Sequence, residues 1–581
     1  MCGIVGYVGA QQAAPILLEG LQKLEYRGYD SAGIAVLDGS TIELAKACGE
    51  IKNLLAKTHD GSDLHGYIGL GHTRWATHGA PTEANAHPHV SNDGKFAIVQ
   101  NGIIENFMEL REMLQAKGFR FHSETDTEVI VHLLDMYYTG DGNLKDTVLK
   151  TLGRLEGSYA IGILCADCPE QMFLARNGCP LIIGVGAGEN FFASDVTALV
   201  SHTKNVVYLD DGELAEVRAD SYTVFDCTGK PIEKPVSRVA WDIEAAEKGG
   251  YEHFMLKEIM EQPRAIKSTL DPRVKDHRVV FDELKMTDAQ LMGFNKIMIT
   301  ACGSAFYAGQ AGKYALEKLT HIPVDADLAS EFRYRDPIVD EHTLMIIISQ
   351  SGETADTIAA IREAQSKGAY VLSIVNVVGS TIARISDDVI YTWAGPEIAV
   401  ATTKGYTTQV SVLYLLALYL GEKRGCLSRE EAAKLTDDLM ILPQMVQRAI
   451  DLNPQIAQLA ERYKNNPSLF FIGRNVDYAV CMEGSLKLKE ISYLHSEAYA
   501  AGELKHGTIA LIEENRLVIA VACYEPLFDK TMSNVKEVKA RGARVLGVAL
   551  EGNRAIYSEA DDVILVPVSY THLTLPTNSR V

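Results

Sequence analysis

The sequence predicts an α/β protein made of several domains, and three observations lead to this prediction. The chain has 581 residues, of which 47% are hydrophobic and 23% are charged, so at about 150 residues per domain it can bury three or four cores. Short apolar runs typical of strands are frequent in residues 2–226, whereas from about residue 290 such runs alternate with helical patterns. The later part also contains an internal repeat, which indicates two similar units.

Residues 2–226 are predicted to form a layered α+β or α/β sandwich, because short strands are interrupted by two helical patterns. The expected strands are Gly3–Gly9, Gly33–Leu37, Ile68–His72, Phe96–Gln100, Tyr159–Cys165 and Phe191–Ala193. The expected helices are Ile104–Lys117 and Thr125–Tyr138. Residues 227–285 are expected to be a linker that continues into a helix over about 253–269, since the polar stretch Asp226–Pro235 carries two prolines.

Residues 286–425 and 459–567 are expected to be two α/β units with parallel sheets, joined by a helical stretch over 408–459. Lys367-Gly-Ala-Tyr-Val-Leu returns as Arg541-Gly-Ala-Arg-Val-Leu, 174 residues later. Residues 568–581 resemble neither unit. We therefore expect an unrelated tail and a shortened second unit that lacks its last crossover helix and strand.

Charge and composition exclude several classes of protein. There are 55 basic and 76 acidic residues, which gives a net charge of −21, and such a chain repels nucleic acids and anionic membranes. The first residues have no pattern of a secretory signal. The longest apolar stretch, Val410–Leu420, is far shorter than the roughly 20 residues that span a bilayer, so we expect a buried helix.

The cysteines indicate a reducing compartment. Ten cysteines are scattered without the spacing of a disulfide framework, which favours reduced thiols and a cytoplasmic location. The pair Cys165 and Cys168 has no second pair to complete a zinc site. Pro169 follows, and we expect a hairpin turn there and no metal site.

The second residue is a candidate nucleophile. Cys2 follows the initiator methionine directly, and removal of that methionine leaves a thiol and a free α-amine on one residue. The amine, with a pKa of about 7.7–8.0, can accept a proton near neutral pH, and the thiolate is nucleophilic. This combination is the principle of N-terminal nucleophile hydrolases. An ordinary buried thiol is the alternative at this point.

Two further segments bring polar groups to strand ends. The segment 72–79 places Arg74, Trp75 and two hydroxyls at the end of an expected strand, and Asn101 and Gly102 follow the next one. An amide and an unobstructed N–H suit an oxyanion hole, where each donor contributes roughly 3–4 kcal/mol, although Asn-Gly is also a hairpin turn. Asp126 opens a helix, where a simple cap is the alternative.

These segments resemble class II glutamine amidotransferases. The motifs are Cys2-Gly-Ile-Val-Gly, Glu25-Tyr-Arg-Gly-Tyr-Asp-Ser-Ala-Gly33, His72-Thr-Arg-Trp-Ala-Thr-His, Asn101-Gly-Ile-Ile-Glu-Asn and Ser123-Glu-Thr-Asp-Thr. The resemblance implies an αββα N-terminal nucleophile (Ntn) hydrolase domain over residues 2–226, in which Cys2 attacks the glutamine amide. The glutamine-binding residues that it implies are Arg74 for the α-carboxylate, Asp126 for the α-ammonium, and Thr77 and His78. At position 100 this chain has Gln where that family usually has His.

The second half contains a candidate phosphate site. An apolar run, Leu344–Ile348, leads into Ser349-Gln-Ser-Gly-Glu-Thr354 and then into a helical pattern over 355–367. A hydroxyl-rich loop at a helix N-terminus binds anions, and because no GxxxxGK or GxGxxG is present, a monophosphate fits better than a nucleotide. A plain helix cap is the alternative. The corresponding loop of the second repeat, Ala522–Phe528, has none of these hydroxyls.

Together with Thr300–Ser304 and Glu397–Lys404, this loop resembles the sugar isomerase (SIS) fold. The domain order is then similar to the glutamine–fructose-6-phosphate aminotransferase family, which implies L-glutamine and fructose 6-phosphate as substrates and a homodimer or larger homo-oligomer. No cofactor and no metal is expected. The implied sugar-phosphate residues are Ser304, Ser349, Gln350, Ser351, Thr354 and Val400; the implied sugar chemistry falls to Glu490 as base, Lys487 as its electrostatic partner and His506 as ring-opening acid/base. Trp75 matches the gate of an ammonia channel.

Three alternatives remain open at this stage. A different class II amidotransferase would need a phosphoribosyl-pyrophosphate or SGGxDS-type loop, and neither is present. A sugar-phosphate-sensing protein would not need Glu490, Lys487 and His506. A glutaminase that makes no amino sugar would follow from the atypical residues 568–581. Lys487 and Glu490, three residues apart, could also be a simple surface ion pair.

Overall fold

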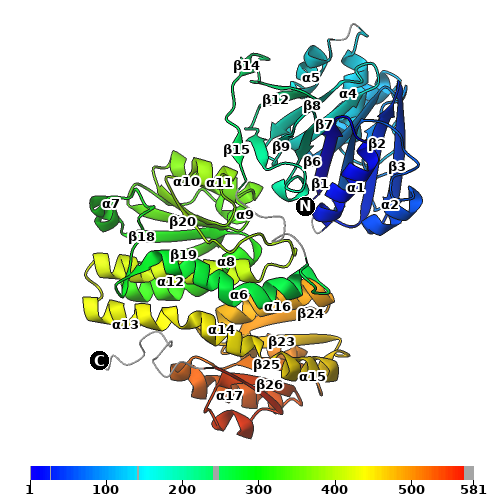
Figure 1. Ribbon diagram of the computed structural model, residues 1–581. Helices are drawn as coiled ribbons and strands as arrows, with labels where there is room; N and C mark the ends of the chain where they lie inside the picture. Colours follow the sequence, from blue (N-terminus) through cyan, green and yellow to red (C-terminus); the bar gives the residue numbers. More distant parts are fainter. Residues whose placement is uncertain (1, 26–27, 77, 141–142, 240–247, 568–581) are drawn as a thin grey trace. The chain divides into compact units, whose positions relative to one another are not determined.

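The computed structural model describes residues 2–25, 28–76, 78–140, 143–239 and 248–567 (Figure 1). The chain divides into two compact units, residues 1–247 and 248–581. Three features of interest in the sequence lie outside the described residues, namely Thr77, the part 240–247 of the expected linker, and the tail 568–581.

The first unit contains two antiparallel sheets. Among the described residues, one sheet has eight strands in the order β15-β11-β9-β10-β1-β4-β2-β3, and the other has seven in the order β14-β13-β12-β8-β7-β6-β5. The strands of the first sheet are β1 (Gly3–Val8), β2 (Ser31–Asp38), β3 (Thr41–Cys48), β4 (Ile68–Arg74), β9 (Ile182–Val185), β10 (Asn190–Ala193), β11 (Asn205–Tyr208) and β15 (Ser237–Arg238). The strands of the second are β5 (His89–Val90), β6 (Phe96–Ile104), β7 (Gly157–Cys165), β8 (Gln171–Asn177), β12 (Leu214–Arg218), β13 (Tyr222–Phe225) and β14 (Pro231–Ile232).

Helices cover the outer face of each sheet, so the first unit has four layers in the order helix, sheet, sheet, helix. The helices are α1 (Ala13–Leu24) and α2 (Ile51–Lys57) on the first sheet, and α3 (Phe107–Ala116), α4 (Glu128–Tyr137) and α5 (Leu144–Leu152) on the second. Alternate residues of β1 show why this works: Val5 and Tyr7 pack with the helices, whereas Ile4 and Val8 pack between the sheets. The αββα architecture predicted for this part is confirmed.

The second unit contains two parallel sheets of five strands each within the described residues. Their orders are β19-β18-β20-β21-β22 and β24-β23-β25-β26-β27, and all neighbouring strands run parallel. The strands of the first are β18 (Lys296–Ala301), β19 (Val324–Leu328), β20 (Thr343–Ser349), β21 (Tyr370–Val375) and β22 (Asp388–Tyr391). The strands of the second are β23 (Ser468–Gly473), β24 (His495–Ala500), β25 (Leu517–Val521), β26 (Arg544–Leu550) and β27 (Asp562–Val566).

The two sheets have the same strand order, in agreement with the internal repeat. Within the described residues β27 pairs with β26 as β22 pairs with β21, so the second sheet has a counterpart of each strand of the first. The expected shortening after residue 567 falls on residues outside the described ones. The connection before β27 is a short 3₁₀ turn, Ala555–Ser558. At the same place before β22, the first parallel sheet has the helix α11. A short hairpin of β16 (Val274–Lys275) and β17 (Arg278–Val279) precedes the first sheet.

Long helices pack on the first parallel sheet. α6, which carries the expected helix after the linker, α8 and α12 share one core with β18, β20 and β22, and α12 packs against both α6 and α8. The helices of this unit are α6 (Phe254–Leu270), α7 (Asp288–Gly293), α8 (Gly303–Thr320), α9 (Ala329–Phe332), α10 (Ala355–Ser366), α11 (Thr381–Ile385), α12 (Lys404–Lys423), α13 (Arg429–Met440), α14 (Leu442–Ile450), α15 (Asn453–Tyr463), α16 (Val476–Ser492) and α17 (Phe528–Lys539).

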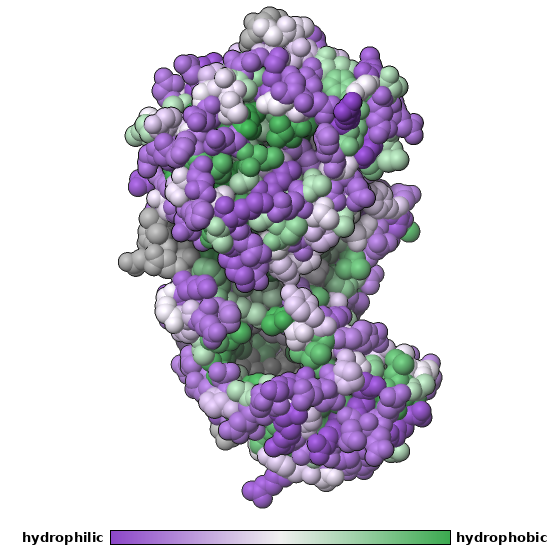
Figure 2. Space-filling view, turned by 90° about the vertical axis from the view of Figure 1, so that its right-hand side faces the viewer, coloured by the Kyte–Doolittle hydropathy of each residue, from purple (hydrophilic) through white to green (hydrophobic). Residues whose placement is uncertain are grey.

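Several local expectations can be compared with these elements. Val410–Leu420 lies within α12, whose leucines are buried, and Cys165 ends β7 before a tight turn into the antiparallel β8. The helices α1, α2 and α5 were not expected. In the described ranges no helix has the length and apolar character needed to cross a membrane. Figure 2 shows one face of the molecule, on which hydrophilic residues predominate and hydrophobic residues form smaller areas.

Candidate active site

Cys2 lies at the start of β1, next to the end of β4. The two strands pair with Gly3 opposite Thr73. The backbone N–H of Trp75 donates to Cys2 Sγ at 3.3 Å, and the thiol lies 3.5 Å from the carbonyl oxygen of Trp75. Burial raises the pKa of the Cys2 thiol above its usual value. A thiol at this position therefore needs a nearby base before it can attack a substrate.

The two candidate oxyanion donors lie inside β6. Asn101 Nδ2 donates to the carbonyl oxygen of Cys2 at 3.1 Å, so the amide lies beside the candidate nucleophile. The expectation that Asn101 and Gly102 follow a strand is wrong, because β6 and β7 stay paired through both residues, which also rules out a hairpin turn. Gly102 has φ +105°, and a Cβ there would lie 2.1 Å from the carbonyl oxygen of Ser158. Only glycine fits this position.

A buried histidine fixes the orientation of Asn101. His72 Nε2 lies 3.0 Å from Asn101 Oδ1 and 3.1 Å from the carbonyl oxygen of Gln100. Both partners are acceptors, so Nε2 carries the proton, and Asn101 must then turn its Nδ2 toward Cys2. Burial lowers the pKa of His72 to about 3, so the ring is neutral at physiological pH. The ring also stacks on His87, with ring centroids 4.1 Å apart.

Gln100, the residue at which this chain departs from class II amidotransferases, belongs to the same buried group. Its backbone N–H donates to His87 Nδ1 at 3.2 Å, and its Oε1 accepts from Thr127 Oγ1 at 2.6 Å. Burial lowers the pKa of His87 well below its usual value. The support behind Asn101 is thus a set of neutral hydrogen bonds, without a charge that could titrate near neutral pH.

The expected glutamine-binding residues lie around Cys2, as far as they are described. Arg74 is buried, and its guanidinium donates to the carbonyl oxygens of His78, Gly79 (3.1 Å) and Ala80 (3.3 Å). The charges that act on it are those of Cys2, Asp30 and Asp126. Thr77 lies outside the described residues.

Asp126 is buried opposite this arginine. Its Oδ2 accepts from the backbone N–H of Ile104 at 2.8 Å, and burial raises the pKa of its carboxyl above the usual value. His78, whose charge acts on Asp126, packs edge-on against Phe107 with ring centroids 5.7 Å apart. A positive and a negative group near one nucleophile can orient a zwitterion such as an amino acid.

Trp75, the expected gate residue, is 44% exposed although it is a large aromatic side chain. Its ring packs edge-on against Tyr29, with centroids 5.2 Å apart. The indole is thus at the surface of the first unit, while the backbone of Trp75 contacts Cys2.

The expected sugar-phosphate residues cluster in the second unit, at one end of the first parallel sheet. Ser304 lies in the first turn of α8, which follows β18, and Ser349 ends β20. β18 has β19 on one side and β20 on the other, so the strand order reverses between β18 and β20. Ligands of open α/β sheets bind in the crevice at such a point, beyond the carboxyl ends of the strands.

The loop 349–354 presents hydroxyls at the N-terminus of α10. Ser349 Oγ accepts from the N–H of Gly352 at 3.0 Å and lies 3.3 Å from Thr354 Oγ1. Ser351 Oγ accepts from the N–H of Glu353 at 3.3 Å, and the side chain of Thr354, the cap residue, makes no capping bond. Gly352 has φ +68°. Hydroxyls gathered at the N-terminus of a 12-residue helix suit the binding of an anion.

A charged cluster on α16 meets this sheet end. Glu483, Lys487 and Glu490 lie on one face of the helix; Lys487 Nζ pairs with Glu490 and lies 3.6 Å from Glu483 Oε1. Ser304 Oγ donates to Glu483 Oε1 at 2.8 Å, which links α8 of the first SIS-like half to α16 of the second. Burial raises the pKa of Glu483 to about 7.

His506 is not joined to this cluster by any described contact. It ends a 3₁₀ turn, Leu504–His506, its side chain is exposed, and its backbone N–H donates to the carbonyl oxygen of Glu503 at 2.9 Å. Val400 and Gln350 lie on two neighbouring loops of the first parallel sheet, both of which contact Asn376.

Two residues of the site received no role from the sequence. His72 was only part of a motif, and Glu483 only the start of another. For Glu483 a signal existed, since it precedes Lys487 by four residues and therefore shares its helix face. His72 lies opposite Ile4 in the sheet, so the alternation of β4 predicts that its side chain points between the two sheets. The alternation does not reveal a hydrogen bond to the other sheet. In the described part of the chain no cluster of His, Cys, Asp and Glu could hold a metal ion.

Comparison with known proteins matches both units. A family model described as a glutamine amidotransferase domain matches residues 50–234, and the SIS domain model matches residues 290–419 and 463–581. A glutamine–fructose-6-phosphate aminotransferase (isomerizing) from Caldanaerobacter subterraneus subsp. tengcongensis is 54% identical over 99% of this chain and 94% of the relative. The chain belongs to this aminotransferase family.

Other members of the aminotransferase family show the same extent of similarity. The relative from Clostridium tetani, which has the same name, is 51% identical over 98% of this chain and 93% of its own length. Among solved structures, the C-terminal domain of glucosamine-fructose-6-phosphate aminotransferase from Francisella tularensis is 37% identical, covers 56% of this chain and 92% of that chain, and has a TM-score of 0.54. The similarity to the aminotransferase family thus includes both the amidotransferase and the SIS regions.

Proposed function

We propose that this chain transfers the amide nitrogen of L-glutamine to fructose 6-phosphate and isomerises the product, which yields glucosamine 6-phosphate and glutamate. The observation that carries the proposal is the presence of two sites on one chain. One combines a half-buried thiol with an oriented amide donor, and the other combines a hydroxyl-rich helix N-terminus with a carboxylate–lysine cluster. Family membership over nearly the whole chain supports the same reaction.

In the glutaminase step, the sulfur of Cys2 attacks the side-chain amide carbon of glutamine. The α-amine of a processed Cys2 takes the thiol proton and later delivers it to the leaving ammonia. Asn101 Nδ2 and the N–H of Gly102 stabilise the oxyanion of the tetrahedral intermediate. Water then hydrolyses the thioester and releases glutamate. Arg74 and Asp126 hold the α-carboxylate and the α-ammonium of the substrate.

In the sugar step, the phosphate of fructose 6-phosphate binds to the loop 349–354 at the N-terminus of α10. Ammonia adds to the C2 carbonyl and water leaves, which gives an imine. Glu490 removes a proton from C1 and returns one to C2, while the proton of the C1 hydroxyl moves to the imine nitrogen, so that the ketose imine becomes an aldose with an amino group on C2. Lys487 pairs with Glu490 as its electrostatic partner, and His506 serves as acid/base for ring opening. Trp75 gates the passage of ammonia.

We further propose a homodimer or larger homo-oligomer in the cytoplasm. The side chain of His506 is exposed, and no described contact joins it to the Glu490 cluster of the same chain. This favours a role of His506 in the site of a second copy. All ten cysteines lie within the described residues and are free thiols there, which supports a reducing compartment. The proposed domains are 2–226 for the glutaminase, and 286–425 and 459–567 for the two SIS units.

The experiment that tests the proposal measures two products separately. The full chain is incubated with glutamine, with and without fructose 6-phosphate, and glutamate and glucosamine 6-phosphate are quantified. Glutamate together with amino sugar in equal amounts is the expected result in the presence of the sugar. Glutamate without amino sugar would show a glutaminase, and no glutamate under either condition would show a protein that only binds sugar phosphates. Either of these two results contradicts the proposed reaction.

A further inference from the structure

The loop 392–403 connects β22 with α12 and has no helix or strand of its own. It carries Val400, which is 62% exposed, at the proposed sugar-phosphate site. The loop lies beside the phosphate loop, because Asn376 contacts both: its N–H donates to the carbonyl oxygen of Gln350 at 3.1 Å, and its Nδ2 donates to that of Gly395 at 2.7 Å. The position of this irregular segment therefore has to be fixed by side chains.

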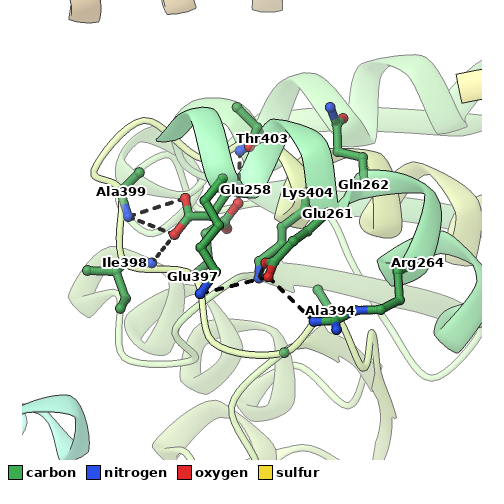
Figure 3. A network of polar contacts seen from close by, with 12 residues as sticks. Glu258, Glu261, Gln262, Arg264, Ala394, Glu397, Ile398, Ala399, Thr403 and Lys404 are labelled. Atoms are coloured by element: carbon green, nitrogen blue, oxygen red, sulfur yellow. Dashed lines mark hydrogen bonds and ion pairs between the residues drawn. The ribbon is translucent and has the colours of Figure 1, made fainter. Parts of the chain in front are cut away.

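One carboxylate holds the loop from inside. Glu397 accepts from Thr402 Oγ1 at 2.6 Å and from the backbone N–H groups of Thr403 at 2.9 Å and Gly405 at 3.0 Å (Figure 3). These bonds close residues 397–403 over the first turn of α12. None of these three bonds involves residues 398–400.

A second carboxylate, from a helix 140 residues earlier in the chain, accepts hydrogen bonds from residues 398 and 399. Glu258 of α6 accepts from the N–H of Ile398 at 2.6 Å, and its two oxygens lie 3.1 and 3.3 Å from the N–H of Ala399 (Figure 3). Glu258 is only 2% exposed. It is therefore a buried carboxylate whose described hydrogen bonds all go to the two residues immediately before Val400.

The same helix also contacts the start of α12. Lys404, which is 2% exposed, donates from Nζ to Glu261 Oε2 at 2.6 Å. Lys257 Nζ and Arg264 Nη2 lie 3.8 and 3.4 Å from Glu261 Oε1. Both ends of the segment 398–404 are thus attached to α6, one through Glu258 and the other through Glu261.

Burial of a carboxylate destabilises the folded state, because the ionised group loses its hydration. The pKa of Glu258 is raised to about 7, mainly by burial and in part by the charge of Glu397, whereas the two N–H donors and Lys404 act to lower it. A hydrophobic side chain would pack here at lower cost, but it would leave the N–H groups of Ile398 and Ala399 without an acceptor. The carboxylate is explained by what it does to this backbone.

We propose that Glu258 is a positioning residue of the sugar-phosphate site, which fixes the backbone of residues 398–399 and thereby places Val400 against the bound sugar. This inference rests on the proposed function of the site. Glu258 touches no substrate and acts only through the loop. Its loss weakens sugar binding, while the glutamine chemistry of the first unit continues.

The test uses the full chain with Glu258→Gln as the main variant. The amide keeps the volume, and its oxygen can take the place of Oε1, which accepts from both N–H groups. Its NH2 group then faces the N–H of Ala399 in place of Oε2, and this repulsion displaces the loop. At pH 8 an ionised Glu258 destabilises the folded state, because its pKa is raised by folding. Removal of this charge should therefore not lower the melting temperature at pH 8. The control is Glu252→Gln, an exposed glutamate shortly before α6. Glu258→Ala is a second variant that removes both acceptors.

The readouts are binding of fructose 6-phosphate by calorimetry without glutamine, KM and kcat for amino-sugar formation, and glutamate release without sugar. We expect at least tenfold weaker sugar binding for Glu258→Gln and a higher KM for the sugar, with glutamate release and melting temperature as in the wild type. Sugar binding within twofold of the wild type would overturn the inference, and so would a loss that only follows a lower melting temperature. If the wild type itself does not bind the sugar phosphate, the proposed function fails as well, and that result is visible without any variant.

Discussion

Replacement of His72 by phenylalanine is expected to slow glutamine hydrolysis by about 10- to 100-fold. Phenylalanine keeps the ring that stacks on His87 at 4.1 Å, so folding should be retained. It removes the N–H that Asn101 Oδ1 and the carbonyl oxygen of Gln100 receive at 3.0 and 3.1 Å. A buried carbonyl without a donor costs about 1–3 kcal/mol, and Asn101 can recover part of this by rotating its amide.

That rotation turns Nδ2 away from the oxyanion position. Complete loss of one oxyanion donor costs roughly 10²- to 10³-fold in kcat, and partial loss gives the smaller range stated above. The assay is the initial rate of glutamate release, with kcat and the KM for glutamine determined separately. KM should change less than about threefold, because Arg74 and Asp126 are untouched. The control is His65→Phe, at an exposed position of the same unit.

One result would refute this reasoning. If His72→Phe is folded, as judged by its melting curve, and its kcat stays within twofold of the wild type, then Asn101 does not depend on His72 for its orientation. A parallel rise in KM with unchanged kcat would equally contradict a role in the transition state.

Three further predictions follow from the described geometry. Cys2→Ala should abolish glutamate release but leave calorimetric binding of fructose 6-phosphate unchanged, and residual glutamate release would exclude Cys2 as nucleophile. Burial lowers the pKa of His72 to about 3, so as the pH falls the unfolded chain binds this proton before the folded chain does. The free energy of unfolding should therefore decrease by up to about 1.4 kcal/mol per pH unit from pH 6.5 to pH 3. When it is measured by urea unfolding at several pH values, its dependence on pH should be weaker in His72→Phe. Gly352→Ala should raise the KM for fructose 6-phosphate at least tenfold, because a Cβ would lie 2.0 Å from Ser380 Oγ at φ +68°, and an unchanged KM would argue against this loop as the phosphate site.

The sequence predicted the large features of the fold well. Alternation in strands such as Gly3–Val8 and the repeat between residues 367 and 541 are local or periodic signals, and both reappear in the sheets. The helix α1 was not expected because its apolar residues, among them Leu17 and Leu21, follow a strand closely and can be read as a continuation of it. The expected shortening of the second SIS unit after residue 567 stays a prediction, because residues 568–581 lie outside the described residues.

The candidate sites were predictable only where one segment carries the whole signal. The loop 349–354 was predicted from its hydroxyl residues between an expected strand and an expected helix. Lys487 and Glu490 were placed on one helix face because they are three residues apart. By contrast, the bond between Ser304 and Glu483 joins residues 179 positions apart, and that between His72 and Asn101 joins neighbouring sheets. Such contacts depend on how layers stack. Without the packed structure, no pattern in the residues involved distinguishes them from ordinary buried polar groups.

The two parallel sheets share one plan, yet they have divided the work. In the first, a hydroxyl-rich turn follows the central strand β20, whereas in the second the equivalent turn after β25 begins with Ala522 and Cys523. The second copy has instead specialised its first crossover helix, α16, for charge. The second sheet thus keeps the strand order of the first but not its hydroxyl-rich turn. The turn after β25 is therefore a place where hydroxyl side chains could be introduced by engineering without altering the loop 349–354.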